Sequence, residues 1–206
     1  LSPEEEARLS LRGVLSALAP EFLEDGRPVL AFDVGGGSTE WALIQPGKEH
    51  RFASLPLGVL SLSQVRPLGD PPEPAAVRAL KQELVRDLGK FLEETLPPDL
   101  PAPPRLVGTA GAVTTLAALS LRMSPYEADR VNNLVLTRSQ VEELAEKLCR
   151  LTEARRARLP GMEPAKAGVM PAGALIVLAI MEVLRQDSLV VIDAGLLEGV
   201  LAEMAP

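Results

Sequence analysis

Residues 33–40 read Asp-Val-Gly-Gly-Gly-Ser-Thr-Glu. This stretch closes a short apolar run, residues 28–34, which predicts a buried strand. Three successive glycines allow positive φ angles and let the backbone come close to a ligand. Consecutive N–H groups in such a turn form a concavity that binds anions. The simpler alternative is a tight hairpin, in which Gly-Gly is common.

Polar side chains surround these glycines. Ser38 and Thr39 add hydroxyl donors, while Asp33 enters the turn and Glu40 leaves it. Both carboxylates can therefore face one pocket. Carboxylates beside bound phosphates usually need a divalent cation between them. The stretch thus predicts a phosphate site with a cation.

A second turn of the same kind follows a predicted strand at 105–107. It reads Gly108-Thr109-Ala110-Gly111 and leads into a helix predicted over 112–122. The N-terminus of that helix carries a partial positive charge that favours anions. Close packing alone also explains a glycine-rich helix entry. Two such turns at neighbouring strand ends, however, can grip two phosphates where α/β sheets bind ligands. Neither turn matches the Walker or dinucleotide fingerprint.

The other segments predict a layered α/β protein. The meander has strands at 28–34, 41–44 and 50–57, and a last strand lies at 188–193. Further helices are predicted at 3–19, 75–95, 138–151 with Thr137 as its cap, 164–185 and 195–204. This order predicts an α/β fold, a mixed sheet with helices on both faces.

Charge and composition exclude several classes of protein. The 206 residues hold 21 Lys and Arg against 28 Asp and Glu, a net charge of −7. Nucleic-acid binders show the opposite balance, so we expect no nucleic-acid partner and a phosphate site built locally. The apolar stretch 169–180 is shorter than the roughly 20 residues that span a bilayer, which predicts no membrane span.

The single cysteine and the single histidine give little indication of a catalytic role. Cys149 is the only cysteine, so no internal disulfide forms, and we expect a cytoplasmic protein. It lies in an amphipathic helical pattern, which predicts a packing role. His50 is the only histidine, and we interpret it as an exposed strand residue.

The ordered motifs resemble the exopolyphosphatase and guanosine pentaphosphate phosphohydrolase family (Ppx/GppA type). The resemblance covers nearly the whole chain. It rests on residues 3–9, 33–40, 54–59 and 107–119, followed by Leu136-Thr137, Leu159-Pro160-Gly161, Ala172-Gly173 and residues 195–199. It implies an actin-like ATPase (ribonuclease-H-like) domain fold of two lobes, with the active site in the cleft between them.

By this resemblance, residues 1–206 are a single second lobe, and residues 1–20 are the last helix of the first lobe. The chain starts at Leu1 without an initiator Met, within a predicted helix. We therefore expect a fragment of a longer protein, inactive in isolation because half of the phosphate cage is missing.

The resemblance also assigns roles. Glu6 is the catalytic glutamate that orients or deprotonates the attacking water. Asp33 and Glu40 help to place Mg²⁺ and water, Asp33 as metal ligand and Glu40 as catalytic residue. The residues expected to hold substrate phosphates are Gly35, Gly36, Gly37, Ser38, Thr39, Gly108, Thr109, Ala110, Gly111 and Lys166. The implied substrate is polyphosphate or a guanosine polyphosphate nucleotide.

Three segments depart from the family pattern. Lys166-Ala167-Gly168 stands for Arg-Ala-Asp, residues 130–133 read Arg-Val-Asn-Asn for Arg-Val-His-Gly, and residues 193–199 lack two arginines. Lysine supplies a positive charge but cannot form the bidentate hydrogen bonds that arginine forms with a phosphate. A short substrate, weak activity or a non-catalytic binding role therefore stay open. An actin-like sugar kinase or chaperone-type ATPase is a further alternative, and so is a homodimer.

Overall fold

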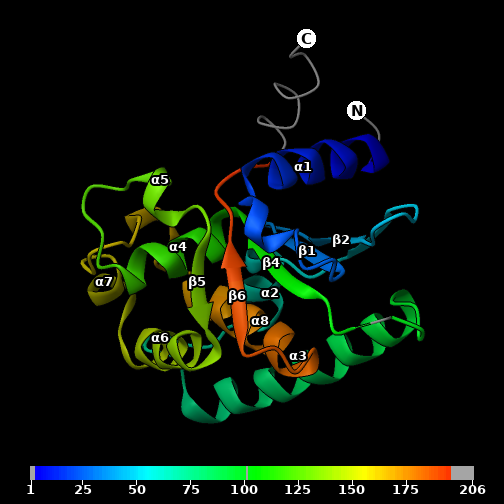
Figure 1. The fold of residues 1–206 in the computed structure, drawn as a ribbon. Coiled ribbons are helices and arrows are strands. Elements are labelled where there is room, and N and C mark those ends of the chain that lie inside the picture. The colour runs from blue at the N-terminus through cyan, green and yellow to red at the C-terminus, as the bar shows by residue number, and fades with distance from the viewer. Residues whose placement is uncertain (1–2, 101, 196–206) are drawn as a thin grey trace.

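The computed structural model describes residues 3–100 and 102–195, with side chains from Arg8 onward. Within those residues, six strands form one mixed sheet in the order β3-β2-β1-β4-β6-β5 (Figure 1). Strands β1 (Val29–Val34), β2 (Thr39–Ile44) and β3 (Arg51–Leu55) pair antiparallel. They form the predicted meander, and the glycine turn joins β1 to β2.

The other half of the sheet extends from β1. Strands β4 (Arg105–Thr109) and β6 (Ser188–Val191) run parallel to β1, and β5 (Leu134–Thr137) closes the edge antiparallel to β6. Parallel strands end at the same side of a sheet, so the turns after β1 and β4 are neighbours. Asp33 pairs with Thr109 at that end.

Helices cover both faces, as predicted. Helix α1 (Pro3–Ala17) packs Leu11 and Val14 on one face, against Ala31 and Val107. The opposite face carries α3 (Pro74–Thr95), α4 (Ala110–Ser120), α6 (Arg138–Arg150) and α8 (Met170–Val183). Figure 1 shows α1 on one side of the sheet, away from α3, α6 and α8. Shorter elements are η1 (Pro20–Phe22), α2 (Val59–Val65), α5 (Ala128–Val131), α7 (Glu153–Arg156) and η2 (Pro164–Lys166).

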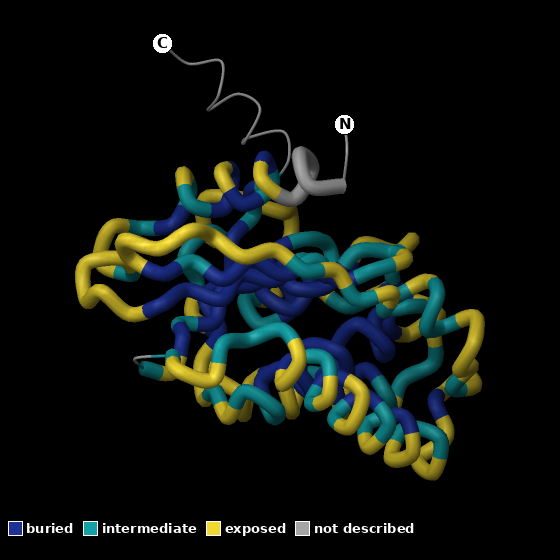
Figure 2. The backbone as a smooth tube through the Cα atoms, turned by 90° about the vertical axis from the view of Figure 1, so that its right-hand side faces the viewer, coloured by how far each residue is buried: buried dark blue, intermediate teal, exposed yellow. Residues whose placement is uncertain are grey.

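The main core lies between the sheet and these helices. Helix α8 is buried all round, which explains its apolar sequence without a membrane. Helix α3 is amphipathic and buries Leu80, Leu84, Leu88 and Leu92, one per turn. Figure 2 shows the buried backbone in the centre of the molecule, with exposed turns around it. Among the described residues, no helix combines the length and hydrophobicity needed to cross a membrane.

Most predicted elements agree with the structure to within a few residues. The short elements η1, α2, α5, α7 and β5 were not predicted. The helix predicted over 164–185 is divided into η2 and α8, and the last strand ends at Val191. Thr137 does cap α6, since its Oγ1 accepts from the N–H of Gln140 at 3.2 Å. Beyond Gly195, the helix predicted over 195–204 lies outside the described residues.

Candidate functional site

The glycine turn is held in place by the start of α2. The N–H of Val59 donates to the carbonyl of Gly35 at 3.0 Å, and that of Leu60 donates to Gly36 at 2.9 Å. The Ser61 N–H also reaches the Gly36 carbonyl, and its hydroxyl donates to the carbonyl of Gly37 at 3.3 Å. The first amides of this helix and the Ser61 hydroxyl thus fix three consecutive carbonyls of the turn.

This arrangement orients the amides of the turn. In a trans peptide, the N–H points away from the carbonyl of the preceding residue. The N–H groups of Gly36, Gly37 and Ser38 therefore point away from α2, and within the described chain they have no acceptor. Three neighbouring amides that point the same way form an anion-binding concavity. The turn is therefore more than a tight hairpin.

Close approach, not positive φ, explains the glycines. Contrary to our expectation, φ is not in the left-handed region at Gly35, Gly36 or Gly37. A Cβ at Gly36 would lie 3.0 Å from Leu60 Cδ1. A Cβ at Gly58 would lie 2.4 Å from the backbone of Gly36 and Gly37. The turn and the entry to α2 are therefore in backbone contact that any side chain at 58 would break.

The two carboxylates of the turn lie side by side. Asp33 and Glu40 pair across β1 and β2, and both project to the sheet face that α1 covers. The hydroxyls of Ser38 and Ser54 donate to Oε1 of Glu40, the latter at 3.3 Å, so this carboxylate has a fixed orientation. Both acids border a small hollow together with Ser10 of α1.

The second turn is equally tight. Ala110 begins α4 with φ +65°, a left-handed conformation that L residues other than glycine rarely adopt. The first amides of an α-helix have no acceptor within the helix, so α4 directs free N–H groups to this end of the sheet. The Thr109 hydroxyl donates to the carbonyl of Ala194 at 2.8 Å, which ties the ends of β4 and β6 together.

Lys166 lies directly against this second turn. Its Nζ and Cε are 3.4 Å from the position of a Cβ at Gly111, and Nζ pairs with Glu163 at 2.7 Å. The segment is anchored by Arg156, which is 2% exposed and whose Nε donates to the carbonyl of Ala167 at 2.7 Å. Lys166 therefore has a defined position beside the start of α4.

The structure brings most predicted site residues to one end of the sheet, but three differ from the prediction. Thr39 is fully buried, and its hydroxyl donates to the carbonyl of Leu57 at 2.5 Å. Gly108 lies inside the sheet, where a Cβ would approach Phe32 to 2.8 Å. The Thr109 side chain is also buried, with its hydroxyl bonded to Ala194. The hydroxyls of Thr39 and Thr109 therefore hold the turns in place and are not directed to a ligand, and Gly108 packs inside the sheet.

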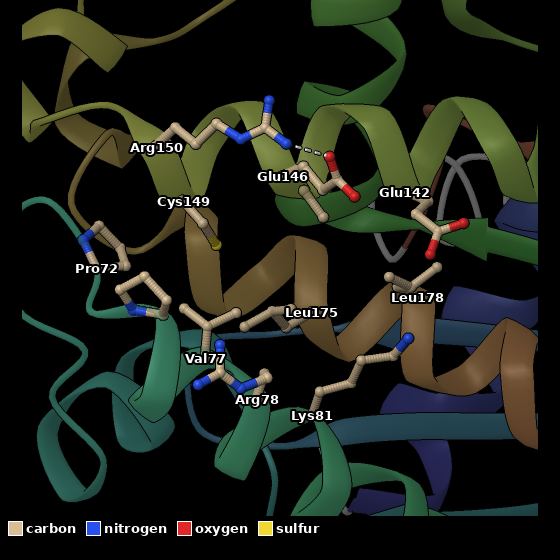
Figure 3. Close-up of a pocket in the computed structure, with 12 residues that line it drawn as sticks. Pro72, Val77, Arg78, Lys81, Glu142, Glu146, Cys149, Arg150, Leu175 and Leu178 are labelled. Atoms are coloured by element: carbon tan, nitrogen blue, oxygen red, sulfur yellow. Dashed lines mark hydrogen bonds and ion pairs between the residues drawn. The ribbon is translucent and has the colours of Figure 1, made fainter.

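Two other predictions concern Glu6 and Cys149. Glu6 lies in α1, but its side chain is outside the described residues. Cys149 lies at a groove between α3, α6 and α8 (Figure 3). Burial raises the pKa of the Cys149 thiol, which lowers its nucleophilicity at neutral pH. This agrees with the predicted packing role.

Several residues at this end of the molecule were missed. Asn133, at φ +63°, donates to the Ala17 carbonyl at 2.9 Å and accepts from the Ala19 N–H at 2.8 Å, so it fixes the end of α1. Asn132 accepts from the N–H of Asp193 at 2.7 Å. Asn132 and Asn133, which we interpreted only as a departure from the family pattern, therefore hold Asp193 and the end of α1 in place. Asparagine tolerates the left-handed conformation at this position.

Comparison with known proteins identifies the family of the chain. The model of the Ppx/GppA phosphatase family matches residues 1–206. The chain belongs to the Ppx/GppA phosphatase family. Exopolyphosphatase 2 of Mycobacterium tuberculosis is 32% identical to it over 208 residues, which cover 98% of this chain and 62% of that protein. A guanosine-5'-triphosphate,3'-diphosphate pyrophosphatase of Vibrio campbellii is 27% identical and covers 99% of this chain, but only 38% of its own length is matched.

Solved structures of the family share the fold. A Ppx/GppA phosphatase of Aquifex aeolicus superposes with a TM-score of 0.84 at 32% identity, covering 100% of this chain and 65% of that one. The predicted actin-like fold is thereby confirmed. The chain spans less than two thirds of the length of these relatives.

Proposed function

We propose that this Ppx/GppA chain forms part of a hydrolase that releases terminal phosphate from inorganic polyphosphate or a guanosine polyphosphate. The observation that carries the proposal is the row of free amides at Gly36, Gly37 and Ser38. It stands beside two carboxylates, Asp33 and Glu40, at the same end of the sheet. Hydrolysis of a phosphoanhydride needs mainly positioned phosphates, neutralised charge and an in-line water.

Each part of this end of the sheet has a task in the proposal. The amides of the first turn hold the oxygens of one phosphate group. The first amides of α4 and the ammonium of Lys166 hold a second group, because both favour negative charge. Glu6 activates the water. Glu6 lies four residues, about one helical turn, before Ser10 in α1, and Ser10 borders the hollow beside Asp33 and Glu40.

Mg²⁺ fits this set of donors. Protein sites for this ion often consist of one or two carboxylates completed by substrate phosphates and water. Asp33 and Glu40 supply two carboxylates, and no cluster of three or more metal-ligating side chains exists in the described part of the chain. Bound there, the ion would neutralise charge on the phosphates. Asp33 would be its ligand, while Glu40, oriented by Ser38 and Ser54, would position water.

Three finer points belong to the same proposal. The chain acts as the second lobe of a cytoplasmic two-lobed enzyme, and the residues up to 20 belong to the helix that ends the first lobe. This division is motivated by the relatives, of which the chain matches 62% to 65% of the length.

The second candidate function is a binding protein with weak turnover. Lys166 favours it, because lysine cannot form the bidentate hydrogen bonds that arginine forms with a phosphate.

Replacing Lys166 tests the second phosphate contact. In the full-length protein with Mg²⁺, we expect Lys166→Met to raise KM for tripolyphosphate roughly 10- to 100-fold, the range for a lost hydrogen bond between charged groups. Phosphate release is the measurement. Lys90→Met is the control, because Lys90 is exposed on α3. Equal KM values for both variants would contradict this role of Lys166, and no release or binding by wild type would contradict the proposed function.

A further inference from the structure

We infer that Arg156 is a positioning residue for phosphate binding, because it holds Lys166 against the second turn. This inference rests on the proposed function, in which the ammonium of Lys166 binds a phosphate. Arg156 lies in α7 and is 2% exposed, and none of its side-chain hydrogen bonds within the described chain reaches either turn. It therefore acts through other residues and does not contact the ligand itself.

The guanidinium of Arg156 joins three backbone carbonyls. Its Nη1 donates to the carbonyls of Leu148 and Leu151, at 3.2 and 2.5 Å, and its Nε donates to the carbonyl of Ala167 at 2.7 Å. The first two carbonyls lie at the end of α6, and the third belongs to the residue that follows Lys166. Because a guanidinium is planar and rigid, these bonds fix Ala167 relative to the end of α6.

Asp70 balances the buried charge of Arg156. Its Oδ1 accepts from Nη2 of Arg156 at 3.3 Å and from the N–H of Glu153 at 2.7 Å. A buried charge is costly unless it is paired, and this half-exposed carboxylate supplies the partner. Asp70 lies in the segment between α2 and α3. The segment that follows the helix holding the first turn thus also supports the residues that hold Lys166 at the second turn.

The backbone that follows Lys166 is held at two successive residues. Ala167 is fully buried, and its carbonyl is bound by Arg156. At Gly168, a Cβ would lie 3.2 Å from Oε2 of Glu153, the first residue of α7, so the glycine leaves room for this carboxylate. Ordering the long side chain of lysine costs conformational entropy. A fixed backbone limits the directions that the Lys166 side chain can take, and so keeps its ammonium at the second turn.

Stability alone does not account for an arginine at this position. Replacing a buried ion pair by apolar side chains of similar volume is often neutral or stabilising. An apolar residue would fill the space of Arg156, but it could not bind the carbonyl of Ala167 to those at the end of α6. The feature that only the guanidinium supplies is therefore the placement of the segment that carries Lys166.

The test measures KM and kcat for tripolyphosphate in the full-length protein with Mg²⁺. Arg156→Lys keeps the charge but cannot bind three carbonyls in one plane. We expect it to raise KM roughly 10-fold, a usual effect of losing a group that orients a binding residue, and to change kcat by less than about 3-fold. In a Lys166→Met background, the same substitution should change KM by less than about 2-fold, because two residues that act through one contact are not additive.

Leu88→Ala is the control for destabilisation. Leu88 is fully buried in α3, and its truncation leaves a cavity in the core, so we expect a lower melting temperature with an unchanged KM. A wild-type KM in folded Arg156→Lys, or a rise that persists in the Lys166→Met background, would overturn the positioning role. Phosphate release by wild type would still support the proposed function in either case.

A second measurement needs no turnover and decides the inference if wild type releases no phosphate. The Gly111 amide of the ligand-free, full-length protein is followed by NMR with ¹⁵N-labelled glycine, because Nζ of Lys166 lies beside this glycine. A shift of this amide in both Arg156→Lys and Lys166→Met, but not in Leu88→Ala, would show that Arg156 places Lys166. Any other pattern rejects the inference.

Discussion

Gly58→Ala is expected to abolish tight phosphate binding. The new Cβ would lie 2.4 Å from C and O of Gly36 and N of Gly37, and these are backbone atoms that cannot rotate away. Either the turn or the start of α2 must move, and the carbonyl bonds that orient the amides of Gly36 and Gly37 are lost. Hydrogen bonds to a charged ligand contribute about 1.5–3 kcal/mol each, so losing two predicts an affinity lower by about 100-fold or more.

Calorimetric titration with pyrophosphate and Mg²⁺ measures this effect. Gly89→Ala is the matched control, because a Cβ at Gly89 in α3 meets nothing within 4 Å. Alanine also favours the helix interior over glycine by about 1 kcal/mol, so this variant should bind normally and unfold no more easily. Wild-type affinity in a folded Gly58→Ala protein would show that α2 does not hold the turn.

Glu6→Gln is expected to lower kcat by about 10²- to 10⁴-fold, the usual contribution of a general base. The amide keeps the size of the side chain but accepts no proton at neutral pH. KM should change little, because the proposal assigns phosphate binding to the turns and not to this residue. Phosphate release from tripolyphosphate by the full-length protein, followed over substrate concentration, separates the two constants.

The control for this experiment is Glu5→Gln, which makes the same change one residue earlier. Neighbouring residues on a helix point about 100° apart, so Glu5 and Glu6 do not share a face. We expect near wild-type turnover from Glu5→Gln. Equal activity of the two variants would remove Glu6 from the mechanism.

Much of the fold follows from local patterns. The meander and α3 have strong periodicity, and Thr137 is followed by the Gln140 of a capping box, so these elements were predicted within a few residues. Helix α2 has seven residues, and β5 has four, of which Thr137 doubles as the cap of α6. Elements this short depend on tertiary contacts, which local sequence does not contain.

In the candidate site, too, the features set by local sequence were predictable, and those set by long-range contacts were not. The glycines, Asp33 and Glu40 are adjacent in sequence, and strand pairing brings the second turn next to them, so their neighbourhood was predictable. The fixation of the turn by α2 was not, because it depends on how Gly58 meets Gly36 across the fold. For the same reason Thr39 was misinterpreted, since its buried bond to Leu57 is a long-range contact.

The most direct test of the phosphate turn observes its amides. The full-length protein with ¹⁵N-labelled glycine and serine is titrated with pyrophosphate and Mg²⁺, and amide shifts are followed by NMR. We predict saturable shifts of the Gly36, Gly37 and Ser38 amides, and also of the Gly111 amide in the second turn. The amide of Gly47, in the distant β2–β3 turn, should not shift. Binding that leaves the three amides unshifted would show that they do not hold phosphate.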